Sequence, residues 1–314
     1  MKITKPGIHE MKAEEYHADP CPTPSLSASI ATKLIDQSPR HAWAAHPRLN
    51  TQHEKEEAAQ FDLGGAAHAL ILEGRDSVVP IDHDNWRTKA AKEERDLARN
   101  AGNYPLLRET YNDALAMVDA CYAQLDATED AKSALRGGNA EQSWFWRDGK
   151  TWLRCRPDWY GDEHVIYDYK TTGGSAHPDT WTRRLYDVGG DLRAALYSEA
   201  ATTLLGWNDI IYRFVIQETK PPYALSIVQL QPSALALAWK RYDKALQLWQ
   251  QCMETDTWPG YPAQIAHVEA PPWQEQRFAE REARDEFMAR MGKDEIQSLI
   301  NWQAPLVAGQ GGSE

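Results

Sequence analysis

The stretch RPDWYGDEHVIYDYKTT, residues 156–172, decides how the chain is interpreted. It holds an aspartate, a turn-like WYGDEH and then a mostly apolar run that predicts a strand. Because strand side chains alternate between two faces, Asp168 and Lys170 project from the same face and Tyr169 from the other. If the two segments pair as a hairpin, Asp158 and Asp168 converge near one end of a sheet. Two carboxylates there suit a cation such as Mg²⁺, and the lysine can orient a water or stabilise charge on a phosphate.

Two further features strengthen the catalytic interpretation of this Asp-x-Lys triplet. By itself such a triplet is most often a surface ion pair. Here Asp158 follows a proline in CRPD, on the segment before the triplet, and Glu141 in NAEQSWFW is expected to start the first strand of a hairpin around Asp148-Gly149. Together these groups indicate metal-assisted hydrolysis of a phosphodiester bond.

Charge and cysteine content exclude several classes of protein. The formal net charge is −12, from 34 basic and 46 acidic side chains, whereas proteins that coat nucleic acid are usually basic. An enzyme that admits nucleic acid through one local basic channel stays compatible with this charge. The four cysteines form no CxxC pair, which predicts reduced thiols rather than a zinc or iron–sulfur site. With no apolar signal or membrane-spanning run visible, we expect a cytoplasmic protein without membrane contact.

The order of predicted elements indicates an α/β (α+β) fold. Periodicity predicts helices over about 1–135, a catalytic sheet over about 140–231 and a closing helix over about 232–254. The sequence reads as helices, three strands, a helix, two strands and a helix. We therefore expect a single domain over 1–262, with a mixed sheet flanked by helices and a helical N-terminal layer. Residues 263–314 are predicted to form a charged arm or tail, partly disordered.

These motifs, taken in order, resemble a known family. Glu141, RPD at 156–158 and DYK at 168–170 look like the PD-(D/E)XK nuclease superfamily, whose core is restriction-endonuclease-like. The closer resemblance is to its exodeoxyribonuclease VIII-like branch, the phage RecE-type exonucleases, over most of residues 8–262. It is carried by SLSASIATKLIDQSPRHAW, GGAAHALILEG, FVIQETKPPYALSIVQL and WPGY, which are similar to segments of that branch.

The resemblance implies a metal site and a catalytic lysine. Lys170 would orient the attacking water, and Glu141 would be a further acid at the site. Without the resemblance, His68 on its alanine-rich helix would more simply be a core histidine. The cofactor implied is Mg²⁺, for which Mn²⁺ would substitute. The implied ligands are His68, Asp158, Asp168 and the backbone carbonyl of Tyr169.

The helix after the DxK strand departs from the family pattern. That branch often has Gln-x-x-x-Tyr there, whereas this chain has RAALY, so Arg193 replaces the glutamine and Tyr197 is kept. The two lie on one helical face, where Arg193 would contact phosphate or form a structural ion pair. Arg156 is expected beside the metal site, since it shares a strand face with Asp158. Further candidate DNA contacts, with loop capping or a solvated helix surface as alternatives, are Thr171, Thr172, Arg183 and Arg184.

The predicted activity is a Mg²⁺-dependent exodeoxyribonuclease acting on the ends of linear double-stranded DNA. The resemblance alone implies 5′-to-3′ degradation that leaves 3′ single-stranded tails for phage-type recombination. It also implies a ring-shaped homo-oligomer and a single-strand annealing protein as partner. Alternatives are a structure-specific or restriction-type endonuclease on the same fold, a DNA-binding protein without catalysis, and an assembly protein that acts through residues 263–314.

Overall fold

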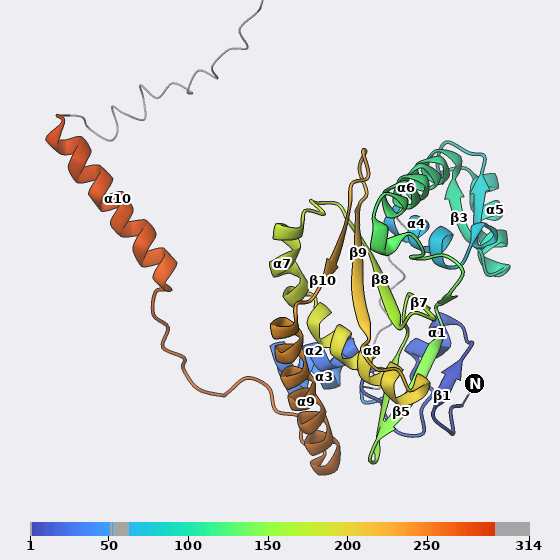
Figure 1. Ribbon diagram of the computed structural model, residues 1–314, viewed down its shortest axis with the longest axis horizontal. Coiled ribbons are helices and arrows are strands. Elements are labelled where there is room, and N and C mark those ends of the chain that lie inside the picture. Colours follow the sequence, from blue (N-terminus) through green and yellow to red (C-terminus); the bar gives the residue numbers. More distant parts are fainter. Residues whose placement is uncertain (1, 51, 53–62, 293–314) are drawn as a thin grey trace, which may run out of the picture. The chain divides into compact units, whose positions relative to one another are not determined.

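Contacts divide the chain into two compact units, Met1–Tyr261 and Pro262–Glu314, which are described separately. The second unit contains helix α10 (Pro272–Arg290), and no residue of this helix is buried. Among the described residues, no helix combines the length and the apolar character that crossing a bilayer requires. The computed structural model (Figure 1) describes residues 2–50, 52 and 63–292.

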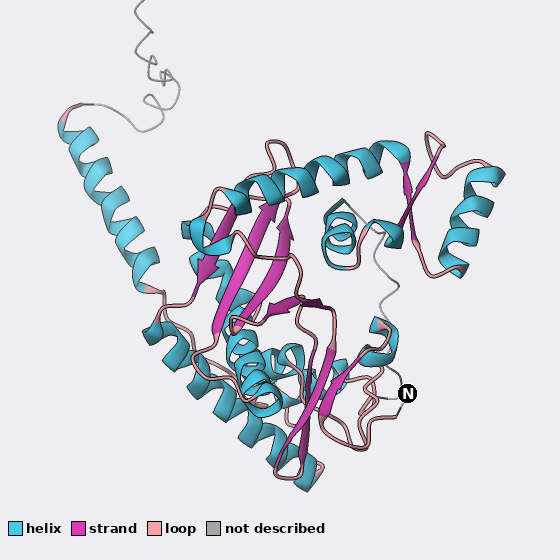
Figure 2. Cartoon of the chain, turned by 45° about the vertical axis from the view of Figure 1, so that its right-hand side comes forward, coloured by secondary structure: helices cyan, strands magenta, loops and turns pink. Residues whose placement is uncertain are grey.

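A five-stranded mixed sheet forms the centre of the first unit (Figure 2). Strands β8 and β9 are parallel, and the remaining neighbours pair antiparallel. The first five residues of β8 are buried, as expected for a strand covered on both faces. The order across the sheet is β10 (Leu225–Gln229), β9 (Ile211–Glu218), β8 (Val165–Thr172), β7 (Trp159–Gly161) and β4 (Asn139–Ala140).

The predicted hairpin belongs to a separate sheet. Strands β5 (Ser143–Asp148) and β6 (Thr151–Cys155) pair around the Asp-Gly turn, and β1 (Gly7–His9) pairs with β5. The expectation that the segment before Asp158 pairs directly with the DxK strand is therefore wrong. The short strand β7 intervenes, because Pro157 has no amide hydrogen to continue the β6 ladder and the chain changes sheets there.

Helices cover both faces of the five-stranded sheet. On one face, Ile166, Phe214 and Ile216 belong to a core that includes helices α2, α8 and α9. On the other face, Tyr167, Tyr169 and Val215 pack with residues of α4 and α6. Asp168 shares the parity of Ile166, so it points to the α8 side. The helices are α2 (Ala28–Asp36), α3 (Pro39–Ala45), α4 (Leu63–Leu72), α6 (Arg108–Asp126), α8 (Gly190–Leu205) and α9 (Pro232–Thr255).

The N-terminal layer is less helical than predicted. Strands β2 (Val78–Ile81) and β3 (Tyr104–Leu107) form a parallel pair, joined by helix α5 (Lys89–Asn100). Val78 and Leu106 anchor this pair on α4 and α6. The sequence also predicts a helix, or a pair of helices, over residues 54–74; α4 lies within this range, and the acidic beginning of the range lies outside the described residues. The remaining elements are α1 (Ala13–His17), α7 (Pro178–Asp187) and two 3₁₀ turns, Arg75–Ser77 and Glu129–Ala131.

Candidate active site

Asp158 lies between β6 and β7, at the seam between the two sheets. Its Oδ2 accepts a 2.8 Å hydrogen bond from the backbone N–H of Tyr169. This bond follows from the β7–β8 register, in which Trp159 pairs with Tyr167. The structure thus brings Asp158 beside the DxK segment, as the sequence predicts, although through a short extra strand.

Glu141 lies where the chain passes from β4 of the five-stranded sheet to β5 of the three-stranded sheet. It precedes β5 instead of starting it, and follows β4 with a φ of 54°. Its N–H donates a 3.2 Å hydrogen bond to the carbonyl of Asp158, and the neighbouring Ala140 pairs with Trp159. Backbone hydrogen bonds therefore close the base of the β5–β6 hairpin, and Glu141 and Asp158 lie on opposite sides of that base.

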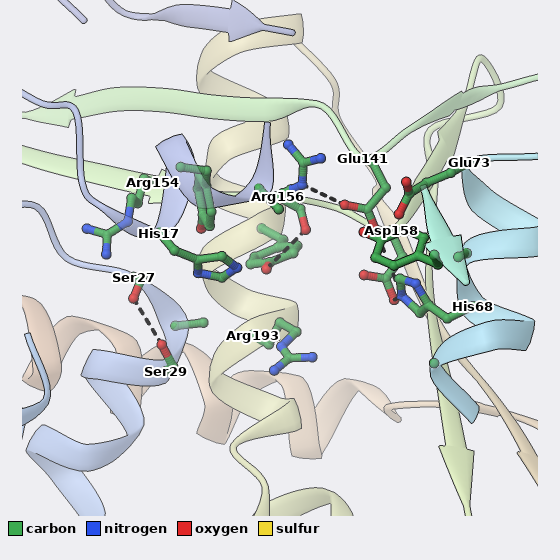
Figure 3. Close-up of a pocket in the computed structure, with 17 residues that line it drawn as sticks. His17, Ser27, Ser29, His68, Glu73, Glu141, Arg154, Arg156, Asp158 and Arg193 are labelled. Carbon is green, nitrogen blue, oxygen red and sulfur yellow. Dashed lines mark hydrogen bonds and ion pairs between the residues drawn. The ribbon is translucent and has the colours of Figure 1, made fainter. Parts of the chain in front are cut away.

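His68 completes a group of possible metal ligands (Figure 3). One ligand atom from each of His68, Glu141 and Asp158 lies within 4.8 Å of the others. His68 Nε2 is 3.8 Å from Glu141 Oε1 and 3.8 Å from Asp158 Oδ2. Two carboxylates and one imidazole suit a divalent cation, and the carboxylates favour Mg²⁺ or Mn²⁺. This donor set fits Mg²⁺, the cation that the sequence predicts, and it fits Mn²⁺ equally well.

Asp168 stands beside this group, with basic partners of its own. Its side chain is 2% exposed and is ion-paired with Lys170 and Arg193. Arg193 Nη1 donates to Asp168 Oδ2 over 2.9 Å, and the Tyr212 hydroxyl donates to the same oxygen over 3.1 Å. Lys170 Nζ also lies 3.7 Å from Asp158 Oδ2. The predicted lysine is therefore held between the two predicted aspartates, while the Tyr169 carbonyl stays a prediction.

The charges of these groups shift one another's pKa values. Burial alone would raise the pKa of Asp158, but Lys170 and His68 outweigh it and hold that pKa well below its usual range. For His68, burial would lower the pKa, but the nearby carboxylate of Asp158 outweighs burial and raises it. Burial and the charge of Asp158 raise the pKa of Glu141. The site therefore contains one firmly ionised acid beside two groups that hold protons more readily.

Arg156 belongs to this site through Glu141. Its Nε donates a 2.5 Å hydrogen bond to Glu141 Oε2, and its Nη1 donates to Ser143 Oγ over 2.8 Å. The carbonyl of Arg156 lies 3.4 Å from the hydroxyl of Tyr197, which donates to it. Arg156 thus holds an acid of the group in place, and it lies beside the possible metal ligands as the strand periodicity predicts.

A cavity of about 450 Å³ opens in front of the ligand group. Arg156, Arg193 and Tyr197 contribute to its lining, as do several residues that the motif did not indicate. These residues come from segments that are distant in sequence and are brought together only by packing. Their spacing from the motif therefore could not predict them. They include His17, Ser27, Ser29, Glu73 and Tyr104.

The other predicted DNA contacts lie outside the lining of this cavity. Thr172 is buried, and its hydroxyl accepts hydrogen bonds from Gly174 N–H over 3.1 Å and from Arg184 Nη1 over 3.4 Å. That arrangement matches the loop-capping alternative for Thr172. Arg183 is exposed on α7, and Thr171 is partly buried. The structure does not bring these side chains to the ligand group.

Comparison with known proteins gives the family. A family model described as a PDDEXK-like domain of unknown function (DUF3799) matches residues 27–271. A crystal structure of a protein called "Putative exonuclease" from Eubacterium rectale aligns with a TM-score of 0.53 and 11% identity, covering 84% of this chain and 96% of that one. No curated protein matches the sequence. The fold is thus that of the PD-(D/E)XK nuclease superfamily, and the chain belongs to the PDDEXK-like family DUF3799.

Proposed function

We propose that this protein is a divalent-cation-dependent deoxyribonuclease that degrades linear double-stranded DNA from its ends. One observation carries the proposal: the carboxylates of Glu141 and Asp158 and the imidazole of His68 converge at one cavity, with the Asp168–Lys170 pair directly behind Asp158. In a chain of a PDDEXK-like family, this set supports phosphodiester hydrolysis.

The chain's own groups have distinct tasks in this reaction. His68, Glu141 and Asp158 would hold the cation, with Asp168 as a further ligand, and the cation would supply Lewis-acid stabilisation of the charge that grows on the phosphate. Lys170 has three N–H donors and is 26% exposed, so it can serve Asp168 and still donate to a water near Asp158. Holding that water in line with the phosphate lowers the entropic part of the barrier.

End-dependence and polarity are the finer parts of the proposal. The resemblance to RecE-type exonucleases supports 5′-to-3′ degradation with 3′ tails, Mg²⁺ as the cation, a ring-shaped homo-oligomer and an annealing partner. The name of the Eubacterium rectale protein agrees with exonuclease activity. A restriction-type or structure-specific endonuclease is the second candidate, since the same fold and ligand group would serve it.

Digestion of end-labelled DNA tests the proposal. A linear duplex labelled at one 5′ or one 3′ end and a closed circle are incubated with Mg²⁺ and the wild type. We expect early release of the 5′ label as mononucleotide, a surviving 3′ strand and an intact circle. Nicking of the circle would favour the endonuclease, and absence of cleavage would overturn the nuclease proposal.

Matched variants tie the activity to the site. Asp168→Ala should abolish cleavage, and Lys170→Ala should slow it by about 10²- to 10³-fold, because it removes one positioned donor. Asp179→Ala, which removes an exposed aspartate of α7, should cleave like the wild type. Equal rates for Asp168→Ala and Asp179→Ala would show that the active site lies elsewhere.

A further inference from the structure

Arg193 stands between the cavity and Asp168. It extends from α8 and contributes to the lining of the cavity, whereas Asp168 and Lys170 do not (Figure 3). Its side chain is 25% exposed, against 2% for Asp168. A ligand that enters from the cavity therefore meets the guanidinium of Arg193 before it reaches the buried carboxylate.

Both oxygens of Asp168 already have partners. Lys170 is ion-paired with Oδ1, while Arg193 and Tyr212 donate hydrogen bonds to Oδ2. The charge of Asp168 raises the pKa of Arg193 further above its already high value, so this arginine stays charged. A divalent cation that uses Asp168 as a ligand would have to approach two fixed positive charges.

The basic partners of the site already neutralise most of its negative charge. Glu141, Asp158 and Asp168 carry three negative charges, and their ion-pair partners Arg156, Lys170 and Arg193 carry three positive ones, while Glu73 in the cavity lining adds one more negative charge. Adding a divalent cation would leave a positive excess at this largely buried site, and uncompensated buried charge is costly. A phosphate in the cavity brings the missing negative charge and offers Arg193 a bidentate partner.

We infer that Arg193 is an internal counter-ion that competes with the catalytic cation for Asp168, and that a phosphate of the substrate draws it away. Substrate and cation then bind cooperatively, because each removes part of the electrostatic cost of the other. Arg193 is thus a positioning residue that keeps the cation site incomplete until DNA is present. This inference rests on the proposed nuclease function and concerns the order in which its site is assembled.

Equilibrium binding of Mn²⁺ tests the inference without measuring cleavage. The probe is a deoxynucleoside 5′-monophosphate, which carries a phosphate but no internucleotide bond, and the phosphate-free deoxynucleoside is its control. Mn²⁺ affinity is measured by calorimetry with and without each compound, after correction for Mn²⁺ bound by the nucleotide itself. For the wild type, we expect the monophosphate to tighten Mn²⁺ binding about tenfold and the nucleoside to leave it unchanged.

Three variants isolate the role of the guanidinium. Arg193→Gln should bind Mn²⁺ about tenfold more tightly than the wild type without nucleotide, and the monophosphate should add little. Arg193→Lys keeps the charge, so it should retain the coupling. Arg99→Gln removes an exposed charge of α5 that does not line the cavity, and it should behave like the wild type. Thermal unfolding of each variant establishes that it is folded.

The outcomes separate this inference from the proposed function. Equal Mn²⁺ affinity and equal coupling in the wild type and Arg193→Gln would overturn the inference and leave the nuclease proposal standing. Loss of the coupling in Arg193→Lys would show that charge alone does not explain it, and would also overturn the inference. If the wild type bound no Mn²⁺ under either condition, the cation-dependent function would fail and the inference with it.

Discussion

In the proposed cation site, His68 makes binding sensitive to protons. The nearby carboxylate of Asp158 outweighs burial and raises the pKa of His68, while burial and the charge of Asp158 raise the pKa of Glu141. A protonated imidazole cannot ligate, so proton and cation compete. As the pH falls below the raised pKa of His68, the dissociation constant for Mn²⁺ should rise about tenfold per pH unit for each competing proton.

Mn²⁺ titrations of the wild type and His68→Gln between pH 8 and pH 5 check this prediction. The variant should bind Mn²⁺ more weakly at pH 8 and show a shallower dependence on pH, since one competing proton is gone. Equal slopes in the two proteins would mean that His68 is not a ligand.

At the residue scale, the sequence predicts the centre of the site better than its surroundings. Strand periodicity is enough to place Asp168 and Lys170 on one face, because it depends only on local geometry. His68 requires the family resemblance, since an alanine-rich helix carries no local sign of a ligand. Tyr104 was not predicted at all, because its place in the cavity depends on how β3 packs against distant helices.

The contact between α2 and α8 determines where Arg193 lies. Gly189, the N-cap of α8, has a φ of +66°, and a Cβ added there would overlap with Thr32 of α2. Gly149 in the hairpin turn also has positive φ, +53°, but a Cβ there would meet open space. An alanine at either position would have to adopt a left-handed backbone, which costs about 1–2 kcal/mol. Only at Gly189 would the added Cβ also overpack, at a further cost of about 1–3 kcal/mol.

Gly189→Ala should therefore lower the free energy of unfolding by about 2–5 kcal/mol, and Gly149→Ala by only about 1–2 kcal/mol. Urea unfolding of the two variants and the wild type measures the difference. If the two alanine variants lost the same stability, the α2–α8 contact would not be the tight one that the backbone indicates.

A buried ion network joins the segment between α1 and α2 to strand β6. The carboxylate of Asp19 lies 3.3 Å from His46 Nε2 and 3.3 Å from Arg154 Nη1, and it accepts a 2.7 Å hydrogen bond from the Ser25 hydroxyl. Burial alone would raise the pKa of Asp19, but His46, Arg154 and Ser25 lower it from 3.8 to about 2. Folding therefore favours the ionised carboxylate.

Since the folded pKa is the lower one, this stabilisation is complete above pH 3.8 and is lost as the pH falls towards 2. The shift corresponds to roughly 2–3 kcal/mol. Asp19→Asn should cost about 3 kcal/mol or more at pH 7, because it leaves Arg154 buried without its counter-charge. Chemical unfolding at pH 7 and near pH 3 measures both effects. A variant as stable as the wild type at pH 7 would refute this role of the network.

At the element scale, the helices and strands that could be predicted are those with a strong local sequence signal. The Asp-Gly hairpin and the closing helix α9 are confirmed, because each has a strong local signal. Strands β2 and β3 were missed, since VVPI and YPLL are short and each contains a proline, which argues against a strand. They form all the same, as a two-stranded pair whose stability comes from packing on α4 and α6.

For the whole molecule, the two units differ in how much they bury. Among the described residues of the second unit, Trp273, Phe278 and Phe287 are 60–63% exposed. Removing residues 262–314 should therefore leave the melting temperature of the first unit unchanged, because no buried contact of α10 is lost. Differential scanning calorimetry of the truncated and full chains checks this. A clear drop in melting temperature would show that the second unit supports the fold.

The closed base of the β5–β6 hairpin has a practical consequence for protein engineering. The Ala140–Trp159 pairing and the Glu141–Asp158 backbone bond fix the two proposed metal-binding acids at the base, while Asp148 and Gly149 at the far end are exposed. The strands of the hairpin are largely buried in the core, and its exposed residues lie at the turn, so the turn can be lengthened without displacing the base. A short epitope tag inserted between Asp148 and Gly149 should leave Mn²⁺ affinity unchanged, whereas the same tag after Glu141 should abolish it. Loss of Mn²⁺ affinity after insertion at the turn would show that a change at the turn is transmitted to the base of the hairpin.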